Sequence, residues 1–223
     1  MSQIERFQTL IKRDTQSGNY SGGLKHARTA LKLFPNDFAI QFLYAKLLGD
    51  WADELPPKEK KKHKRESLKI IRSLVRRLRG KSLELRFGVS LNLYYQAEDF
   101  LGMVRFGRRF QSAWRAKGIY ATALGACLHA QKLYQAGRTR PAATWAKRSV
   151  EAWKKYDLQK DRYYFAHYSF AKALALSGDV RGAQSALSKA AKLARRPLSD
   201  WEFADVLQIL KERKTASYSK REK

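Results

Sequence analysis

The side chains that most often carry metal or acid–base chemistry are few in this chain and widely spaced. The four histidines, His26, His63, His129 and His167, lack the spacing of a metal-binding motif. Cys127 is the only cysteine, so neither an intramolecular disulfide nor a multi-cysteine zinc site can form. These residues therefore predict no metal site and no cofactor.

Other catalytic patterns are missing as well. No glycine-rich loop ending in Gly-Lys follows a predicted strand, so the sequence offers no phosphate-binding loop of that kind. The acidic pairs Asp53-Glu54 and Glu98-Asp99 fall at expected turns, where solvated caps explain them. We expect a protein that is not an enzyme.

Charge is the strongest chemical feature of the sequence. The 223 residues include 46 Lys+Arg and 20 Asp+Glu, a formal net charge of +26. Such a surface attracts polyanions, so nucleic acid, acidic protein and anionic lipid are the partner classes to consider. Because 44% of the residues are apolar and 12% aromatic, the chain is not a disordered basic tail.

The cations are concentrated in residues 58–81, which hold twelve Lys/Arg and two acids. Cations that open a helix oppose its dipole, at about 0.3–1 kcal/mol each, so this run indicates either a functional contact, which we favour, or fraying at the start of the helix. The later return helices continue the basic band, with Arg105, Arg108, Arg109 and Arg115, then Lys147, Arg148, Lys154 and Lys155, then Lys189, Lys192, Arg195 and Arg196. The predicted polyanion patch comprises Lys58, Lys60, Lys61, Lys62, Lys64, Arg65, Arg72, Arg76, Arg79, Arg105, Arg108 and Arg109. Such a band could follow a phosphate backbone with strongly salt-dependent affinity.

Helical periodicity positions these residues and runs almost from end to end. The expected turns lie at residues 18, 98, 137 and 178, with an irregular one near 53. The first expected hairpin lies within residues 4–37. The later helices pair as 38–48 with 58–79, 82–97 with a return helix that carries Met103 and Trp114, 119–136 with 139–156, and 161–177 with 180–195. A last helix, 199–213, opens with a capping box in which Ser199 is followed three residues later by Glu202.

One helix–turn–helix phrase recurs along the chain. Gly18-Asn19-Tyr20, followed by spaced alanines and a proline, returns at Gly178-Asp179-Val180. Residues 4–37 resemble a tetratricopeptide repeat (TPR), in which a large residue, Leu, Gly-x-Tyr, alanines and Pro occupy fixed slots. The matching residues are Phe7, Leu10, Gly18, Tyr20, Ala27, Ala30 and Pro35, whereas Ile11 and Gly23 depart from the pattern.

The resemblance implies an all-α, right-handed α-solenoid of about five antiparallel helix hairpins with a C-terminal capping helix. Residues 1–214 would form this single TPR-like domain. Residues 215–223 (TASYSKREK) would form a basic, disordered tail. In the TPR family the first helix of each hairpin lines a concave groove that receives a peptide or a partner helix.

Tyrosines and cations on the first helices are the groove candidates. They are Tyr44, Lys46, Arg86, Tyr94, Lys132, Tyr134, Tyr168 and Lys172. An aromatic, cationic groove suits a carboxylate-bearing peptide, although aromatics at helical spacing more often pack in a core.

These observations predict a cytoplasmic, non-catalytic TPR-like adaptor or scaffold that binds an acidic protein or peptide. The alternative is nucleic-acid or ribonucleoprotein binding, RNA included, through the basic band and especially residues 58–81. The charged N-terminus has no signal-peptide pattern, and no stretch approaches the about 18–20 apolar residues of a membrane span. We therefore expect no integral membrane contact.

Overall fold

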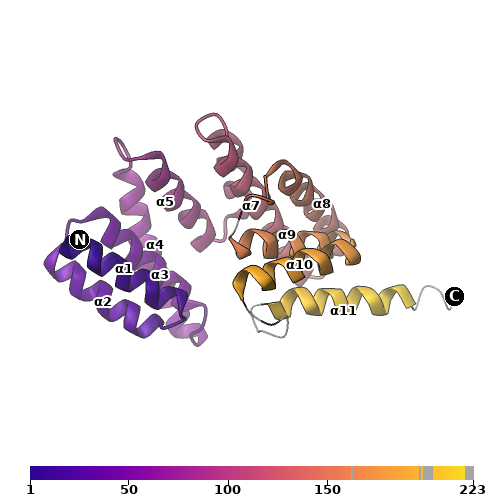
Figure 1. Cartoon of the computed structure of the whole chain (residues 1–223), viewed down its shortest axis with the longest axis horizontal. Helices are drawn as coiled ribbons and strands as arrows, with labels where there is room; N and C mark the ends of the chain where they lie inside the picture. The colour runs from indigo at the N-terminus through magenta and orange to yellow at the C-terminus, as the bar shows by residue number, and fades with distance from the viewer. Residues whose placement is uncertain (162, 196, 198–202, 219–223) are drawn as a thin grey trace. The chain divides into compact units, whose positions relative to one another are not determined.

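The computed structural model describes residues 1–161, 163–195, 197 and 203–218, and every regular element in these ranges is a helix (Figure 1). The helices are α1 (Gln3–Gln16), α2 (Tyr20–Leu33), α3 (Phe38–Ala52), α4 (Pro57–Arg76), α5 (Leu83–Gln96), α6 (Phe100–Phe110), α7 (Arg115–Gln135), α8 (Thr139–Lys155), α9 (Tyr164–Ser177), α10 (Val180–Ala194) and α11 (Ala204–Tyr218). The predicted all-α class is confirmed. The chain divides into two compact units, Met1–Asp99 and Phe100–Lys223.

All four predicted turns contain a residue in the left-handed backbone region. Gly18, Gly137 and Gly178 have φ values of 75°, 73° and 98°, and Glu98 has a φ of 52°. Glycine adopts this region without steric cost, which is why it ends helices so often. Glu98 shows that a turn between two helices of this chain does not require glycine.

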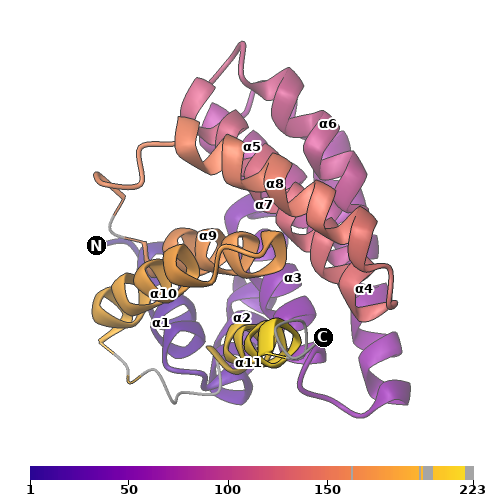
Figure 2. The same cartoon turned by 90° about the vertical axis from the view of Figure 1, so that its right-hand side faces the viewer.

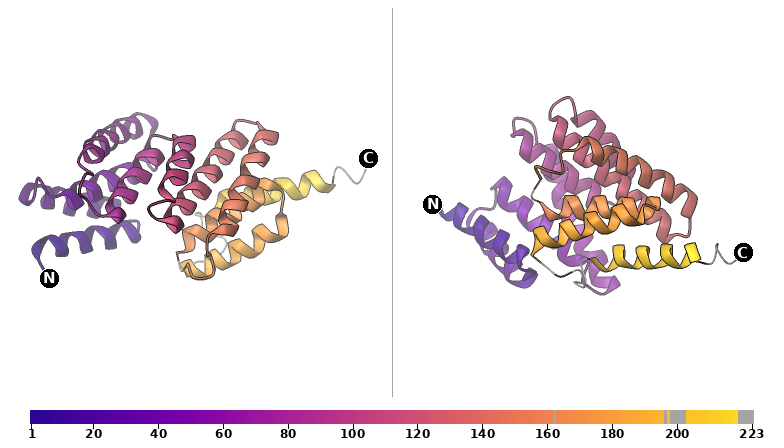
Figure 3. Two further views of the ribbon diagram at one scale, coloured as in Figure 1. Left: turned by 90° about the horizontal axis from the view of Figure 1, so that it is seen from above. Right: turned by 45° about the vertical axis from the view of Figure 1, so that its right-hand side comes forward.

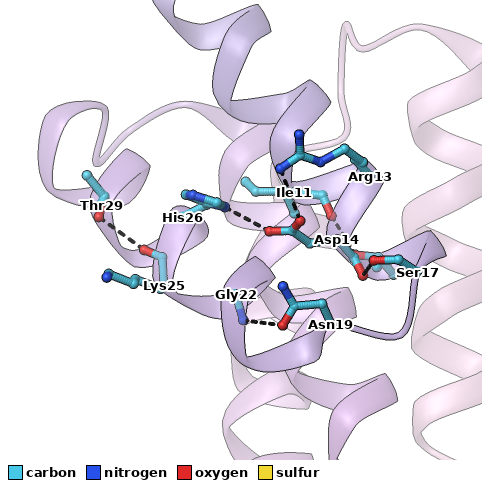
Figure 4. Close-up of polar contacts among 10 residues, drawn as sticks. Ile11, Arg13, Asp14, Ser17, Asn19, Gly22, Lys25, His26 and Thr29 are labelled. Atoms are coloured by element: carbon cyan, nitrogen blue, oxygen red, sulfur yellow. Dashed lines mark hydrogen bonds and ion pairs between the residues drawn. The ribbon is translucent and has the colours of Figure 1, made fainter.

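The first hairpin of the first unit is held by polar contacts at its turn (Figure 4). The Asn19 side chain caps α2 by accepting a hydrogen bond from the Gly22 amide at 3.1 Å. Across the hairpin, the buried Asp14 carboxylate lies 2.9 Å from Nδ1 of His26. His26 therefore has a structural role here.

A small residue lets α2 approach α3. A Cβ atom at Gly23 would lie 2.8 Å from the Leu47 side chain, a distance that real Cβ atoms essentially never show. The atom involved is Cδ2 at the end of the Leu47 side chain, so the alanine that the TPR pattern prefers at this slot would require that side chain to shift. Leu24, Ala27 and Ala30 complete the buried face of α2.

The second unit uses glycine in the same way between α6 and α7. A Cβ atom at Gly107 would lie 2.6 Å from the Thr122 backbone nitrogen and 2.7 Å from the Gly118 carbonyl oxygen. The two helices therefore cross backbone to backbone at Gly107 and Gly118. Figure 3 shows the successive helices of this unit folding back on one another as hairpins.

The last hairpin repeats the capping seen in the first. Asp179 caps α10 by accepting a hydrogen bond from the Gly182 amide at 2.9 Å, as Asn19 does for Gly22 in α2. The phrase that recurs in the sequence thus recurs as the same cap geometry.

The C-terminal helix differs from its predicted bounds. α11 spans Ala204–Tyr218 instead of residues 199–213, and it includes the first four residues of the expected tail. The predicted capping box at Ser199 and Glu202 lies outside the described residues. α11 packs on α9 and α10 (Figure 2), and its Val206, Ile209 and Leu210 join a shared core together with Phe203, which directly precedes the helix.

Candidate functional site

Helix α4 is amphipathic, and its apolar face fixes which of its cations point outward. Ser67, Ile71 and Leu74 are buried, and the Ser67 hydroxyl donates a 2.7 Å hydrogen bond to the Ala45 carbonyl of α3. Pro57 occupies the first turn, where a missing amide proton costs nothing. The opposite face of α4 is left to solvent.

That outward face carries a line of cations, which we call the α4 stripe. Its members are exposed and have no ion pair among the residues that the structure describes. They are Lys58, Lys62, Arg65, Lys69, Arg72 and Arg76. At 100° per residue they fall within an arc of about 80°, and the stripe is about 27 Å long. The two acids of α4, Glu59 and Glu66, fall outside this arc.

Most of the predicted patch is exposed, with two members turned inward. Lys61 is exposed beside the stripe, and Arg79 is exposed in the turn that follows α4. Lys60 and Lys64 instead pair with Asp53, at 3.0 and 2.8 Å. Burial alone would raise the pKa of Asp53, but hydrogen bonds from these two ammonium groups outweigh it and lower the pKa below its ordinary value. Lys60 and Lys64 therefore stabilise the α3–α4 connection.

The remaining patch residues belong to the second unit. Arg105, Arg108 and Arg109 are exposed on α6, opposite its buried Gly102, Met103 and Val104 face. They have no ion pair within the described part of the chain.

The predicted groove residues of the first unit are largely satisfied by their own neighbours. The Tyr44 side chain is buried, and its hydroxyl donates a 3.0 Å hydrogen bond to Glu66. Burial, followed by this hydrogen bond, raises the pKa of Tyr44. Lys46 pairs with Asp50 at 2.6 Å, one helical turn along α3. Arg86 is exposed and Tyr94 is half-buried on α5.

In the second unit, two predicted groove residues meet at one carboxylate. Lys172 is only 6% exposed, and its ammonium group lies 2.6 Å from Oδ2 of Asp205. The Tyr168 hydroxyl donates a 2.6 Å hydrogen bond to Oδ1 of the same carboxylate. Gln131 completes the cluster, since its carbonyl oxygen accepts a 3.1 Å bond from Lys172 and its amide donates a 3.4 Å bond to Asp205.

A third groove residue holds a second carboxylate of the same helix. The Tyr134 hydroxyl donates a hydrogen bond to Glu212, and Gln208 donates a 2.8 Å bond to that carboxylate. These two bonds lower the pKa of Glu212 below its ordinary value. Lys132, two residues before Tyr134, is exposed on a different side of α7, with its ammonium group 5.9 Å from the centre of the Phe100 ring.

The second unit thus brings Tyr134, Tyr168 and Lys172 together around α11, and we call the surface formed by Gln131, Tyr134, Tyr168 and Lys172 the α7–α9 face. Sequence reasoning missed its ligands, Asp205 and Glu212. The available signal was their spacing, because residues seven apart share one helix face.

The residues that first suggested chemistry have packing roles. His167 is buried, with its Nε2 atom 3.0 Å from the Asp161 carbonyl oxygen. The His129 and Trp145 rings pack edge to face, with their centres 4.9 Å apart. Burial raises the pKa of the Cys127 thiol to about 12. In the described ranges no cluster of three His, Cys, Asp or Glu side chains could hold a metal ion. No described helix is both long and apolar enough to cross a membrane.

Comparison with known proteins adds no family. A scan of family models finds no match in this chain, and a search of curated proteins finds no significant match either. The α4 stripe and the α7–α9 face are therefore the two features of the chain that point to a function.

Proposed function

We propose that this protein is a non-catalytic, TPR-like helical-repeat protein that binds nucleic acid through the α4 stripe. The observation that carries the proposal is a line of six exposed cations on the helix face opposite the buried one, none of them in an ion pair with any residue that the structure describes. A right-handed solenoid of hairpins is part of the proposal. It is supported by the hairpin packing within each unit and by the matching caps at Asn19 and Asp179.

The chemistry of the stripe favours a phosphate backbone. Arginine and lysine both bind phosphate, and arginine can do so through two parallel hydrogen bonds. The stripe offers three of each, in a straight line along one helix. Contacts of this kind read charge and not base sequence, so we expect sequence-tolerant binding that weakens steeply with salt.

An anionic membrane fits this stripe less well. A helix that lies in a membrane interface places an apolar face beside its cations. The apolar face of α4 is already buried against its neighbours α3 and α5. A nucleic acid needs no such face.

The test compares two variants with the same loss of charge. In the stripe variant Lys62, Arg65, Lys69 and Arg72 become glutamine. In the control variant the exposed Lys147, Lys154, Lys155 and Lys189 of the second unit become glutamine. We expect the stripe variant to bind a labelled single-stranded RNA at least about tenfold more weakly than the control variant at 150 mM salt. Equal affinity of the two variants would mean that net charge, and not the stripe, attracts the RNA.

A second function, as an adaptor for a carboxylate-bearing protein or peptide, is favoured by the α7–α9 face. Its tyrosines and Lys172 already hold two carboxylates of α11. Lys132 is exposed on α7, so reversing its charge would bury no carboxylate. If the adaptor function is correct, Lys132→Glu weakens the capture of an aspartate-rich helical peptide in a fluorescence anisotropy assay, and unchanged capture would contradict it.

A further inference from the structure

The ammonium group of Lys172 is the chemical centre of the α7–α9 face. It is nearly buried, and the ion pair that the structure gives it is with Asp205. The ammonium also lies 4.6 Å from the centre of the Tyr168 ring, so the tyrosine contacts both members of the pair. A buried cation needs a carboxylate close by, and here α11 supplies it.

The helix that supplies this carboxylate has the pattern of a docked peptide. Asp205 and Glu212 lie seven residues apart and reach the α7–α9 face. Phe203, Val206 and Leu210 recur at helical spacing and are buried against α9 and α10. Helices that dock in grooves are recognised through apolar anchors at i, i+3 and i+7, which is the spacing of these three residues.

We propose that the α7–α9 face is a docking site for an amphipathic helix with two carboxylates seven residues apart, and that α11 occupies it as an intramolecular ligand. The proposal rests on the adaptor function given above. It adds the chemistry of the partner and a competition: an external helix gains access only when α11 is released. The apparent affinity for that helix is then its intrinsic affinity multiplied by the fraction of time for which the site is open.

The charge of α11 separates this site from general attraction to a basic protein. Residues 203–218 contain two carboxylates and three cations, so a peptide of this sequence is net positive. A chain with a net charge of +26 repels such a peptide at long range. Binding must therefore come from specific contacts with the site.

The experiment uses a fluorescein-labelled peptide of residues 203–218 and the full chain. In the loosened chain Asp205→Asn and Glu212→Gln remove the two carboxylates of α11 and leave its apolar residues in place. In the matched control chain Glu151→Gln and Asp157→Asn make the same charge change at exposed positions. Anisotropy at 150 mM salt gives the affinities, a scrambled peptide measures background, and circular dichroism verifies that each variant is folded.

We expect the loosened chain to bind the peptide at least tenfold more tightly than the wild-type and control chains do. Adding Lys172→Met to the loosened chain removes this binding. Glu212→Gln alone, which changes only an exposed contact, gives a smaller gain and serves if the double variant unfolds.

Two results would overturn the proposal in different ways. Equal binding by the wild-type and loosened chains would leave the adaptor function standing but show that α11 does not compete. No binding by any of the chains would remove the adaptor function together with the competition.

Discussion

Removing either member of the Lys172–Asp205 pair should destabilise the second unit, and the two losses should be unequal. Asp205→Asn leaves an ammonium that is 6% exposed without a carboxylate. Removing one partner of a buried pair costs about 3–5 kcal/mol, and we expect about 2–4 kcal/mol here because the Asp205 side chain is 36% exposed. Lys172→Met keeps the volume, and Asp205 retains its bonds from Tyr168 and Gln131, so about 1–2 kcal/mol is expected.

The double variant should cost less than the sum of the single ones, because it leaves no unpaired buried charge. The expected coupling is about 1.5–3 kcal/mol, measured as free energies of unfolding in urea at pH 7. The Lys160–Asp157 pair is the control, since its N···O distance is 2.9 Å but its side chains are 87% and 53% exposed. That pair should show no measurable coupling. Additive losses at Lys172 and Asp205, or a larger loss from Lys172→Met than from Asp205→Asn, would refute this reasoning.

Three further outcomes follow from local geometry. Gly107→Ala should lower the unfolding free energy by about 1–3 kcal/mol because its new methyl group meets backbone atoms. Gly88→Ala should raise it by about 0.5–1 kcal/mol, because its new Cβ atom lies at an ordinary contact distance of 3.6 Å from the Phe42 ring and alanine favours the helix. Urea unfolding that ranks the two variants the other way would contradict the packing. The raised pKa of Cys127 and its burial predict no reaction with a thiol reagent in the native protein and one equivalent after unfolding, and fast native labelling would argue against its burial. The pKa of Glu212 is lowered in the folded state, so this carboxylate stabilises the fold at pH values above its unfolded-state pKa. The stabilisation is lost as the pH falls through the folded-state pKa. In an NMR titration, Tyr134→Phe should return the pKa of Glu212 toward its ordinary value.

The turns could be predicted from the sequence because local chemistry decides them. Gly18, Gly137 and Gly178 punctuate helical periodicity, and a helix end needs a residue that accepts positive φ. The turn at residue 98 was expected from the break in periodicity and is confirmed, with Glu98 in the strained position. Helix bounds were less certain. The capping box at Ser199 favoured a start near residue 199, whereas the described α11 begins at Ala204.

Helical periodicity separates the inward-facing cations of residues 58–65 from the solvent-facing ones only when the buried face of α4 is known. With Ile71 and Leu74 inside, Lys60 and Lys64 fall on the inward side of α4, while Lys62 and Arg65 fall outside. Composition alone treats all of these cations alike.

The α7–α9 face could be predicted only in part. The residue types of Tyr168 and Lys172 indicated a groove for a carboxylate-bearing partner, and that partner stays a prediction; within the chain these two side chains contact the Asp205 carboxylate. That the ligand is Asp205 depends on a contact between segments 33 residues apart, which no local pattern fixes. Gly107 and Gly118 illustrate the same limit, because their role is the close crossing of two helices.

The central claim, that the α4 stripe binds nucleic acid, is tested most directly by the salt dependence of binding. For a single strand, the logarithm of the binding constant falls with the logarithm of salt concentration with a slope of about −0.7 per phosphate contacted. Loss of the four stripe charges Lys62, Arg65, Lys69 and Arg72 should reduce the magnitude of that slope by about 3. The control variant with four charges removed from α8 and α10 should keep the wild-type slope. An equal reduction of the slope in both variants, or no RNA binding by the wild-type chain at low salt, would contradict the claim.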